Sequence, residues 1–138
     1  MVGERKARVL IIDDDVGFRE LVRIHLSLAG FAPEVASDAV EGGEALFAHP
    51  PDLVLCDIKM PFMSGLDLLS LMKTDQRTAT IPVILVSGHS DEDTMAKAIK
   101  LGAADYLTKP VLVEDLLQSI HACLARCDRK LAGEKQFA

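Results

Sequence analysis

The polar side chains best suited to chemistry in this 138-residue chain follow short apolar runs, at the point where each run ends. They comprise carboxylates, a hydroxyl and an ammonium group: Asp13, Asp14, Asp15, Asp57, Ser87 and Lys109. Carboxylates that lie side by side raise one another's pKa and cannot all stay ionised without a cation. Mg²⁺ binds oxygen ligands and needs few carboxylates, because it keeps several of its waters. The residue types therefore predict a Mg²⁺ site if the fold brings them together.

A metal site alone does not need Ser87 or Lys109, and both indicate that an anion also binds. The ammonium group supplies a point charge and the hydroxyl a hydrogen-bond donor. Carboxylates, Mg²⁺, a lysine and a hydroxyl together suit phosphoryl transfer, in which positioning and charge neutralisation do most of the catalysis. An ionised carboxylate can itself be the nucleophile and become an acyl phosphate. Each residue alone is more simply explained as a polar end of a strand, but the full set favours a site.

Short aliphatic runs alternate with helical patterns along the whole chain. The runs predict strands at 9–12, 34–36, 53–56, 82–86 and 105–108. The helical patterns lie at 18–29, 44–48, 66–73, 91–101 and 113–127. Continuous aliphatic runs are typical of strands covered on both faces, so strict alternation predicts an α/β fold with a parallel sheet between two layers of helices. In such sheets ligands bind beyond the carboxyl ends of the strands, where the polar residues lie.

Capping residues predict several helix boundaries. Ser64 is the expected N-cap of the helix at 66–73, and Gly30 and Gly102 are expected to end the first and fourth helices. The pair of glycines at 42–43 leaves the beginning of the second helix open, because glycine is costly inside helices. Residues 1–131 are interpreted as one domain, and residues 132–138 as a short polar tail or the beginning of a linker.

The composition excludes several classes of protein. With 15 Lys and Arg against 21 Asp and Glu, the net charge of −6 repels polyphosphates, so direct binding to nucleic acid is not expected. No apolar run is long enough to span a membrane, and the charged first eight residues lack the apolar core of a secretory signal. The three cysteines are an odd number without a CxxC motif, which favours a reduced, cytoplasmic protein.

Four motifs resemble, in order and spacing, those of the receiver domains of bacterial two-component response regulators, chemotaxis regulators among them. They are VLIIDDD at 9–15, DIKMP at 57–61 with Gly65, VSG at 86–88 and YLTKP at 106–110. Each motif is weak alone, but together they are specific, and the resemblance covers about residues 8–128. It implies a doubly wound (βα)5, flavodoxin-like fold, with five parallel strands in the order 2-1-3-4-5 and helices on both faces.

The resemblance also implies roles for the acidic residues and the lysine. Asp57 corresponds to the phosphoacceptor. Asp14, Asp57 and the backbone carbonyl of Lys59 resemble the Mg²⁺ ligands, with Asp13 acting through a water. Lys109 resembles the residue that pairs with the phosphoryl group.

Further residues resemble those that control the state of the family's switch. Ser87 and Tyr106 resemble the switch pair, in which the hydroxyl moves to the new phosphate and the aromatic ring turns inward. The peptide bond before Pro110 is expected to be cis, which only X-Pro bonds allow at low cost. Lys59 and His89 occupy the positions that tune phosphoryl lifetime in the family, and exposed side chains without a role are an equally simple interpretation.

The resemblance implies partners as well as a switch. A phosphoryl group adds nearly two negative charges at one position. It shifts the loop after the fourth strand from one conformation to another only if it makes better contacts with one of the two. The readout face would comprise the helix at 91–101, the strand at 105–108 and the helix at 113–127, with a homodimer through this face as an option. The expected partners are a sensor histidine kinase or histidine phosphotransfer protein, and a downstream target protein or fused output domain. No separate metabolite is turned over, so an enzyme is not expected.

Other interpretations are weaker. A phosphatase of the haloacid-dehalogenase type needs an acid two residues after its nucleophile, where this chain has Lys59. A Rossmann or P-loop nucleotide-binding protein needs glycines after the first strand, where this chain has three aspartates. The remaining alternative is a receiver fold that works as a phosphorylation-independent interaction or dimerisation module. The substitution Asp57→Asn would abolish signalling in a switch and leave partner binding intact in such a module.

Overall fold

Strands and helices alternate in the computed structural model, which describes residues 5–88 and 91–137, with side chains up to residue 127. The strands are β1 (Arg8–Ile12), β2 (Ala32–Ala36), β3 (Leu53–Asp57), β4 (Val83–Ser87) and β5 (Asp105–Thr108). The helices are α1 (Val16–Leu28), α2 (Ala39–Ala48), α3 (Gly65–Thr74), α4 (Glu92–Lys100) and α5 (Val113–Phe137). The alternation predicted from the sequence is confirmed.

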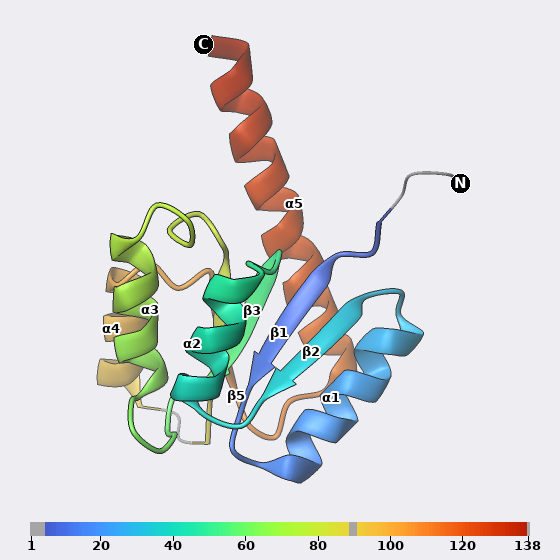
Figure 1. Cartoon of the computed structure of the whole chain (residues 1–138), viewed down its shortest axis with the longest axis vertical. Helices are drawn as coiled ribbons and strands as arrows, with labels where there is room; N and C mark the ends of the chain where they lie inside the picture. Colours follow the sequence, from blue (N-terminus) through green and yellow to red (C-terminus); the bar gives the residue numbers. More distant parts are fainter. Residues whose placement is uncertain (1–4, 89–90, 138) are drawn as a thin grey trace.

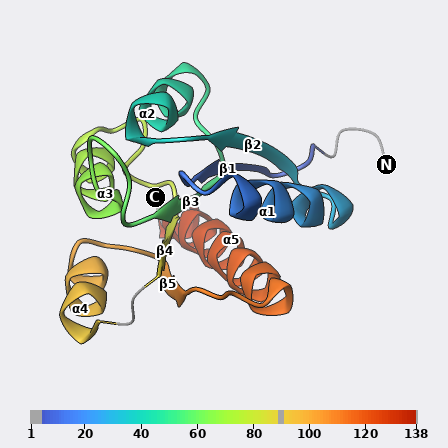
Figure 2. The same ribbon diagram turned by 90° about the horizontal axis from the view of Figure 1, so that it is seen from below.

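The five strands form one parallel sheet in the order β2-β1-β3-β4-β5. Buried side chains of α1 and α5 pack on one face of the sheet, and those of α2, α3 and α4 pack on the other. Figures 1 and 2 show these two helical layers on either side of the strands. All residues of β3 and β4 are buried, as expected for parallel strands covered on both faces. The doubly wound fold with strand order 2-1-3-4-5 is confirmed.

The second helix begins earlier than the sequence pattern suggests, at Ala39 rather than near residue 44. Asp38 is its N-cap, and its carboxylate accepts a hydrogen bond from the Glu41 N–H. Gly42 is buried against the sheet, where an added Cβ would lie 2.6 Å from Ile12 Cδ1. The glycine therefore lets α2 approach β1 closely. The free energy gained by this packing outweighs the low helix propensity of glycine.

The other predicted helix boundaries agree with the structure. The Ser64 hydroxyl accepts a hydrogen bond from the N–H of Asp67 at the start of α3. Gly30 and Gly102, which follow α1 and α4, have φ angles of 94° and 99°. Glycine adopts this left-handed conformation without strain, so both residues end their helices as expected.

The outer helices differ from the predicted pattern in two respects. On α1, Val22 is buried, as its place in the apolar pattern at three- and four-residue spacing predicts, whereas Leu21 and Leu28, which belong to the same pattern, are 49% and 80% exposed. Figure 1 shows α5 projecting beyond the sheet, and its helix continues to Phe137 through the stretch interpreted as a tail or linker. None of the helices described is long and apolar enough to cross a membrane.

Candidate functional site

The carboxyl ends of four strands bring the predicted site residues to one edge of the sheet. Asp13 follows β1, Asp57 is the last residue of β3, and Ser87 is the last residue of β4. Lys109 follows β5, and its N–H donates to the Ser87 carbonyl at 2.8 Å. Asp13, Asp57 and Ser87 are 1%, 7% and 4% exposed. Polar groups buried this deeply need partners, and so the contacts among them define the site.

Three carboxylates form a cluster at this edge. Asp13, Asp14 and Asp57 each offer one carboxylate oxygen, and these oxygens all lie within 4.8 Å of one another. Asp14 is exposed, so the cluster opens to solvent on that side. Asp15 has a different role, because its carboxylate caps α1 by accepting the Phe18 N–H at 3.2 Å. The acidic triplet therefore divides into two cluster residues and one helix cap.

Lys109 is the cation that faces the cluster. Its Nζ lies 2.9 Å from Asp13 Oδ2 and 3.8 Å from Asp57 Oδ2. Despite this ion pair, the buried Asp13 Oδ2 accepts no hydrogen bond from any residue that the structure describes. Among the described residues, Lys109 forms the ion pairs with this cluster of three carboxylates, so the cluster keeps an excess of negative charge.

This excess is reflected in the pKa of Asp57. Burial, the largest cause, and the neighbouring carboxylates of Asp13 and Asp14 raise the pKa of Asp57 to about 6, against the opposing effects of Lys109 and the Lys59 N–H. A divalent cation would remove this penalty. The donor set consists of oxygens, carries excess negative charge and includes an under-bonded buried oxygen, and these features fit a hard ion such as Mg²⁺.

The loop after β3 packs closely under Asp57. The Gly65 N–H donates to the Ile58 carbonyl at 2.8 Å, and an added Cβ at Gly65 would overlap the Asp57 carbonyl oxygen. Glycine at this position therefore allows the start of α3 to lie against the end of β3. Cys56, which precedes Asp57, is buried, and burial raises the pKa of its thiol, as is typical of an inert core cysteine.

The remaining predicted residues lie around this cluster. Tyr106 is half-buried on β5 and packs against the core shared by α2, α3 and α4. The peptide bond before Pro110 is cis, as the resemblance implies. The Lys59 side chain is exposed, and His89 lies outside the described residues.

Two residues of α1, Phe18 and Arg19, contact the site although the sequence did not single them out for chemistry. The Phe18 ring centroid lies 4.4 Å from Lys109 Nζ, and Arg19 Nη1 donates to the Asp13 carbonyl at 2.8 Å. The helical pattern explained Phe18 as one residue of an apolar face. One feature of the sequence could have indicated this contact: Phe18 lies in the first helical turn after the acidic triplet. That turn begins at the carboxyl ends of the strands, where the site lies.

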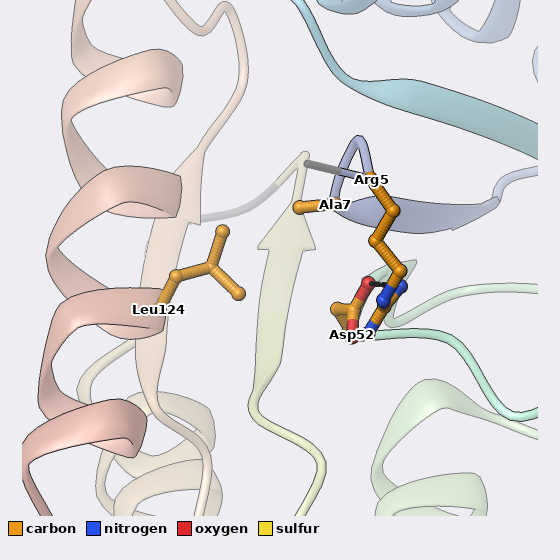
Figure 3. Close-up of a pocket in the computed structure, with 4 residues that line it drawn as sticks. All are labelled: Arg5, Ala7, Asp52 and Leu124. Atoms are coloured by element: carbon orange, nitrogen blue, oxygen red, sulfur yellow. Dashed lines mark hydrogen bonds and ion pairs between the residues drawn. The ribbon is translucent and has the colours of Figure 1, made fainter. Parts of the chain in front are cut away.

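A pocket of another kind lies at the amino ends of the strands, opposite the acidic cluster. Arg5, Ala7, Asp52 and Leu124 line it, and Figure 3 shows the Arg5 guanidinium directed at the Asp52 carboxylate. Two hydrogen bonds of 2.9 and 2.8 Å join these groups. The hydrogen bond from Arg5, the largest cause, holds the pKa of Asp52 below its usual range. Charges in this pocket are paired, which indicates a structural contact.

Comparison with known proteins identifies the family. The sequence profile of the response regulator receiver domain matches residues 9–121. The chain belongs to this family. Receiver domains are phosphorylation-activated switches of two-component systems, and they bind Mg²⁺ at an acidic pocket.

Relatives and solved structures support this assignment. The DNA-binding dual master transcriptional regulator RpaA of Synechocystis is 37% identical over 122 residues, which are 88% of this chain and 51% of that protein. PhoB, the phosphate regulon transcriptional regulatory protein of Pseudomonas aeruginosa, is 32% identical over 91% of this chain and 54% of its own length. The chain therefore spans about half the length of these curated relatives.

Solved receiver domains share the fold over nearly their whole length. A CheY-like receiver domain protein from Methanospirillum hungatei superposes with a TM-score of 0.86 at 29% identity, covering 91% of this chain and 99% of that one. A receiver domain protein from Clostridium thermocellum gives a TM-score of 0.82 at 34% identity, covering 91% and 98%. The described fold is thus that of these solved receiver domains.

Proposed function

We propose that Asp57 is the residue of this receiver domain that accepts the phosphoryl group. The observation that carries the proposal is the convergence of a buried carboxylate, two further carboxylates within 4.8 Å and a lysine ammonium at 3.8 Å. With a phosphohistidine donor, an Asp57 carboxylate oxygen attacks phosphorus. The new O–P bond forms as the N–P bond breaks, and the histidine ring leaves and takes up a proton. Attack by water on the acyl phosphate returns the carboxylate and releases phosphate.

The other residues of the site have distinct roles in this proposal. Asp13, Asp14, Asp57 and the backbone carbonyl of Lys59 would hold Mg²⁺, with Asp13 acting through a water. The bound ion supplies positive charge that offsets the charge of the phosphoryl oxygens. Lys109, whose Nζ already lies 3.8 Å from Asp57 Oδ2, pairs with the phosphoryl group with little movement of its ammonium. These groups neutralise charge and orient the reaction, which is the main requirement of phosphoryl transfer.

The proposal for the switch and its readout rests on the family resemblance, and the position of Ser87 supports it. Ser87 ends β4 next to the end of β3, and its hydroxyl donates to the phosphoryl group, while Tyr106 turns inward behind it. The changed surface is the face made by α4, β5 and α5. The lifetime of the phosphoryl group is tuned by the side chains of Lys59 and His89. Like other receiver domains, the chain is a signalling phosphoacceptor and turns over no separate substrate.

The partners are inferred from the family. The phosphodonor is a sensor histidine kinase or a histidine phosphotransfer protein in the cytoplasm. The output is a downstream protein or a fused domain, in line with the relatives named as transcriptional regulators. Residues 1–131 make up the receiver domain, and 132–138 begin a tail or linker. With a net charge of −6, the chain itself does not bind nucleic acid, and a homodimer forms through the α4-β5-α5 face where the output requires one.

Acetyl phosphate tests the proposal without the cognate kinase. Intact mass is measured after incubation with acetyl phosphate and Mg²⁺, beside an Asp57→Asn variant and a sample with EDTA. The expected result is one phosphoryl adduct that requires both Asp57 and the metal. A folded, Mg²⁺-binding protein without an adduct would contradict the proposal and favour the phosphorylation-independent module.

A further inference from the structure

The ammonium group of Lys109 has an aromatic neighbour as well as acidic ones. Its Nζ lies 4.4 Å from the centroid of the Phe18 ring and 2.9 Å from Asp13 Oδ2. An ammonium within about 6 Å of a ring centroid is attracted by the negative face of the ring. The lysine is therefore held from two sides, by a carboxylate after β1 and by an aromatic ring on α1.

The Phe18 ring is fixed by the way α1 begins. The Phe18 N–H donates to the carboxylate of Asp15, the N-cap, at 3.2 Å. Arg19, the next residue, donates from Nη1 to the Asp13 carbonyl at 2.8 Å and ties the same turn to the end of β1. The ring packs against the core cluster on the α1 and α5 face of the sheet. The ring position is thus set by the backbone that also carries Asp13.

A lysine at a phosphoryl site needs such support. Its ammonium is a point charge at the end of four flexible methylenes, so holding it in one place costs conformational entropy. The Lys109 side chain is 23% exposed, which leaves room for other rotamers on the solvent side. A ring on that ammonium favours the position near Asp13, which is also 3.8 Å from Asp57 Oδ2.

We propose that Phe18 is a positioning residue, whose aromatic face holds the Lys109 ammonium at the phosphoryl-binding position. The inference rests on the proposed function, because it gives Phe18 a role only if Lys109 assists phosphoryl transfer. A cation–π contact at a partly exposed site corresponds to roughly a two- to fivefold change in an equilibrium or rate. The effect depends on the aromatic face, so a leucine of similar bulk does not replace it.

The test compares Phe18→Leu and Phe18→Tyr with wild type in the rate of phosphorylation by acetyl phosphate and Mg²⁺. The expected rate falls roughly two- to fivefold in Phe18→Leu and returns close to wild type in Phe18→Tyr. Phe47→Leu is the matched control, because the Phe47 ring stacks 4.8 Å from the Arg77 guanidinium, outside the site. Its rate should equal that of wild type.

A second readout needs neither metal nor phosphodonor. In the metal-free wild-type protein, the ring current of Phe18 should shift the Lys109 ε-methylene proton resonances upfield, and Phe18→Leu should return them to ordinary values. Resonances at ordinary positions in the folded wild-type protein would overturn the inference, whatever the variants do.

Lys109→Met separates failure of the inference from failure of the proposed function. If Lys109→Met leaves the rate of phosphorylation unchanged, the assigned role of Lys109 is wrong, and the inference falls with it. If Lys109→Met slows the reaction but Phe18→Leu does not, only the inference is wrong. In the Lys109→Met background, Phe18→Leu should have no further effect. A further loss equal to that in wild type would show that Phe18 acts by another route.

Discussion

Each end of the sheet carries ion pairs, but among the described residues the charges balance only at the amino end, where the pair is more exposed. At the amino end, Asp52 accepts two hydrogen bonds from Arg5 and a third, of 2.7 Å, from the Arg8 N–H. These contacts hold the pKa of Asp52 below its usual value. At the carboxyl end, one lysine faces three aspartates, and the pKa of Asp57 rises to about 6.

The comparison shows how a stabilising contact differs from a binding site. A carboxylate with enough donors of its own has no need of a ligand, and its charge favours the folded state. A buried carboxylate with too few cations destabilises the folded state until a ligand arrives. The direction of the pKa shift therefore distinguishes the structural end of the sheet from the functional end.

The largest expected difference between the two ends is in metal binding. Asp57→Asn removes a charged ligand from the acidic cluster and should weaken Mg²⁺ binding at least tenfold, on the order of effects seen for groups that support metal sites. Asp52→Asn, the matched substitution at the amino end, should leave the affinity unchanged. Isothermal titration calorimetry with Mg²⁺ measures both. Equal affinities for the two variants would break the comparison.

The substitution that weakens metal binding, Asp57→Asn, should stabilise the metal-free protein. Because the pKa of folded Asp57 lies above its ordinary value of 3.8, its contribution to stability is full below that value and is lost as the pH rises through about 6. Asp57→Asn should therefore stabilise the protein in EDTA by about 1–3 kcal/mol at alkaline pH, and by almost nothing near pH 4. Urea unfolding across this pH range measures the difference, and a destabilised variant at alkaline pH would be contrary to expectation.

The smallest expected effect belongs to the paired amino end. The pKa of folded Asp52 lies below 3.8, so its contribution to stability is present above that value and is lost as the pH falls through the lowered pKa. Because this carboxylate is partly exposed, Asp52→Asn should cost only about 0.5–1 kcal/mol at neutral pH. The same unfolding series measures it. A loss of stability that persists at strongly acidic pH would have to come from a cause other than this ion pair.

The sequence predicts the fold and the composition of the site because both depend on strands that end in polar residues. Aliphatic runs with an aspartate, serine or lysine after them place these side chains at one edge of a parallel sheet, whatever the details of packing. The family resemblance adds the strand order. The individual contacts within the site, such as the ion pair between Lys109 and Asp13, depend on how the side chains pack in three dimensions, which the strand pattern does not describe.

The features that the sequence does not predict depend on contacts between distant segments. The early start of α2 depends on the close approach of Gly42 to Ile12, which helix propensity does not register. The exposure of Leu21 and Leu28 depends on which part of α1 the sheet and α5 cover. The contact of Phe18 with Lys109 joins residues 91 positions apart, and a helical pattern describes only which face of one helix is apolar.

The most direct test of the account locates the phosphoryl group. The protein is phosphorylated with acetyl phosphate and Mg²⁺ and reduced with borohydride, which converts an aspartyl phosphate to homoserine. Peptide mass spectrometry then identifies the reduced residue. The account predicts homoserine at position 57 and at no other aspartate, including Asp13, Asp14 and Asp52. Homoserine at another position, with Asp57 unmodified, would contradict the claim that the unbalanced carboxyl end of the sheet is a phosphoryl site centred on Asp57.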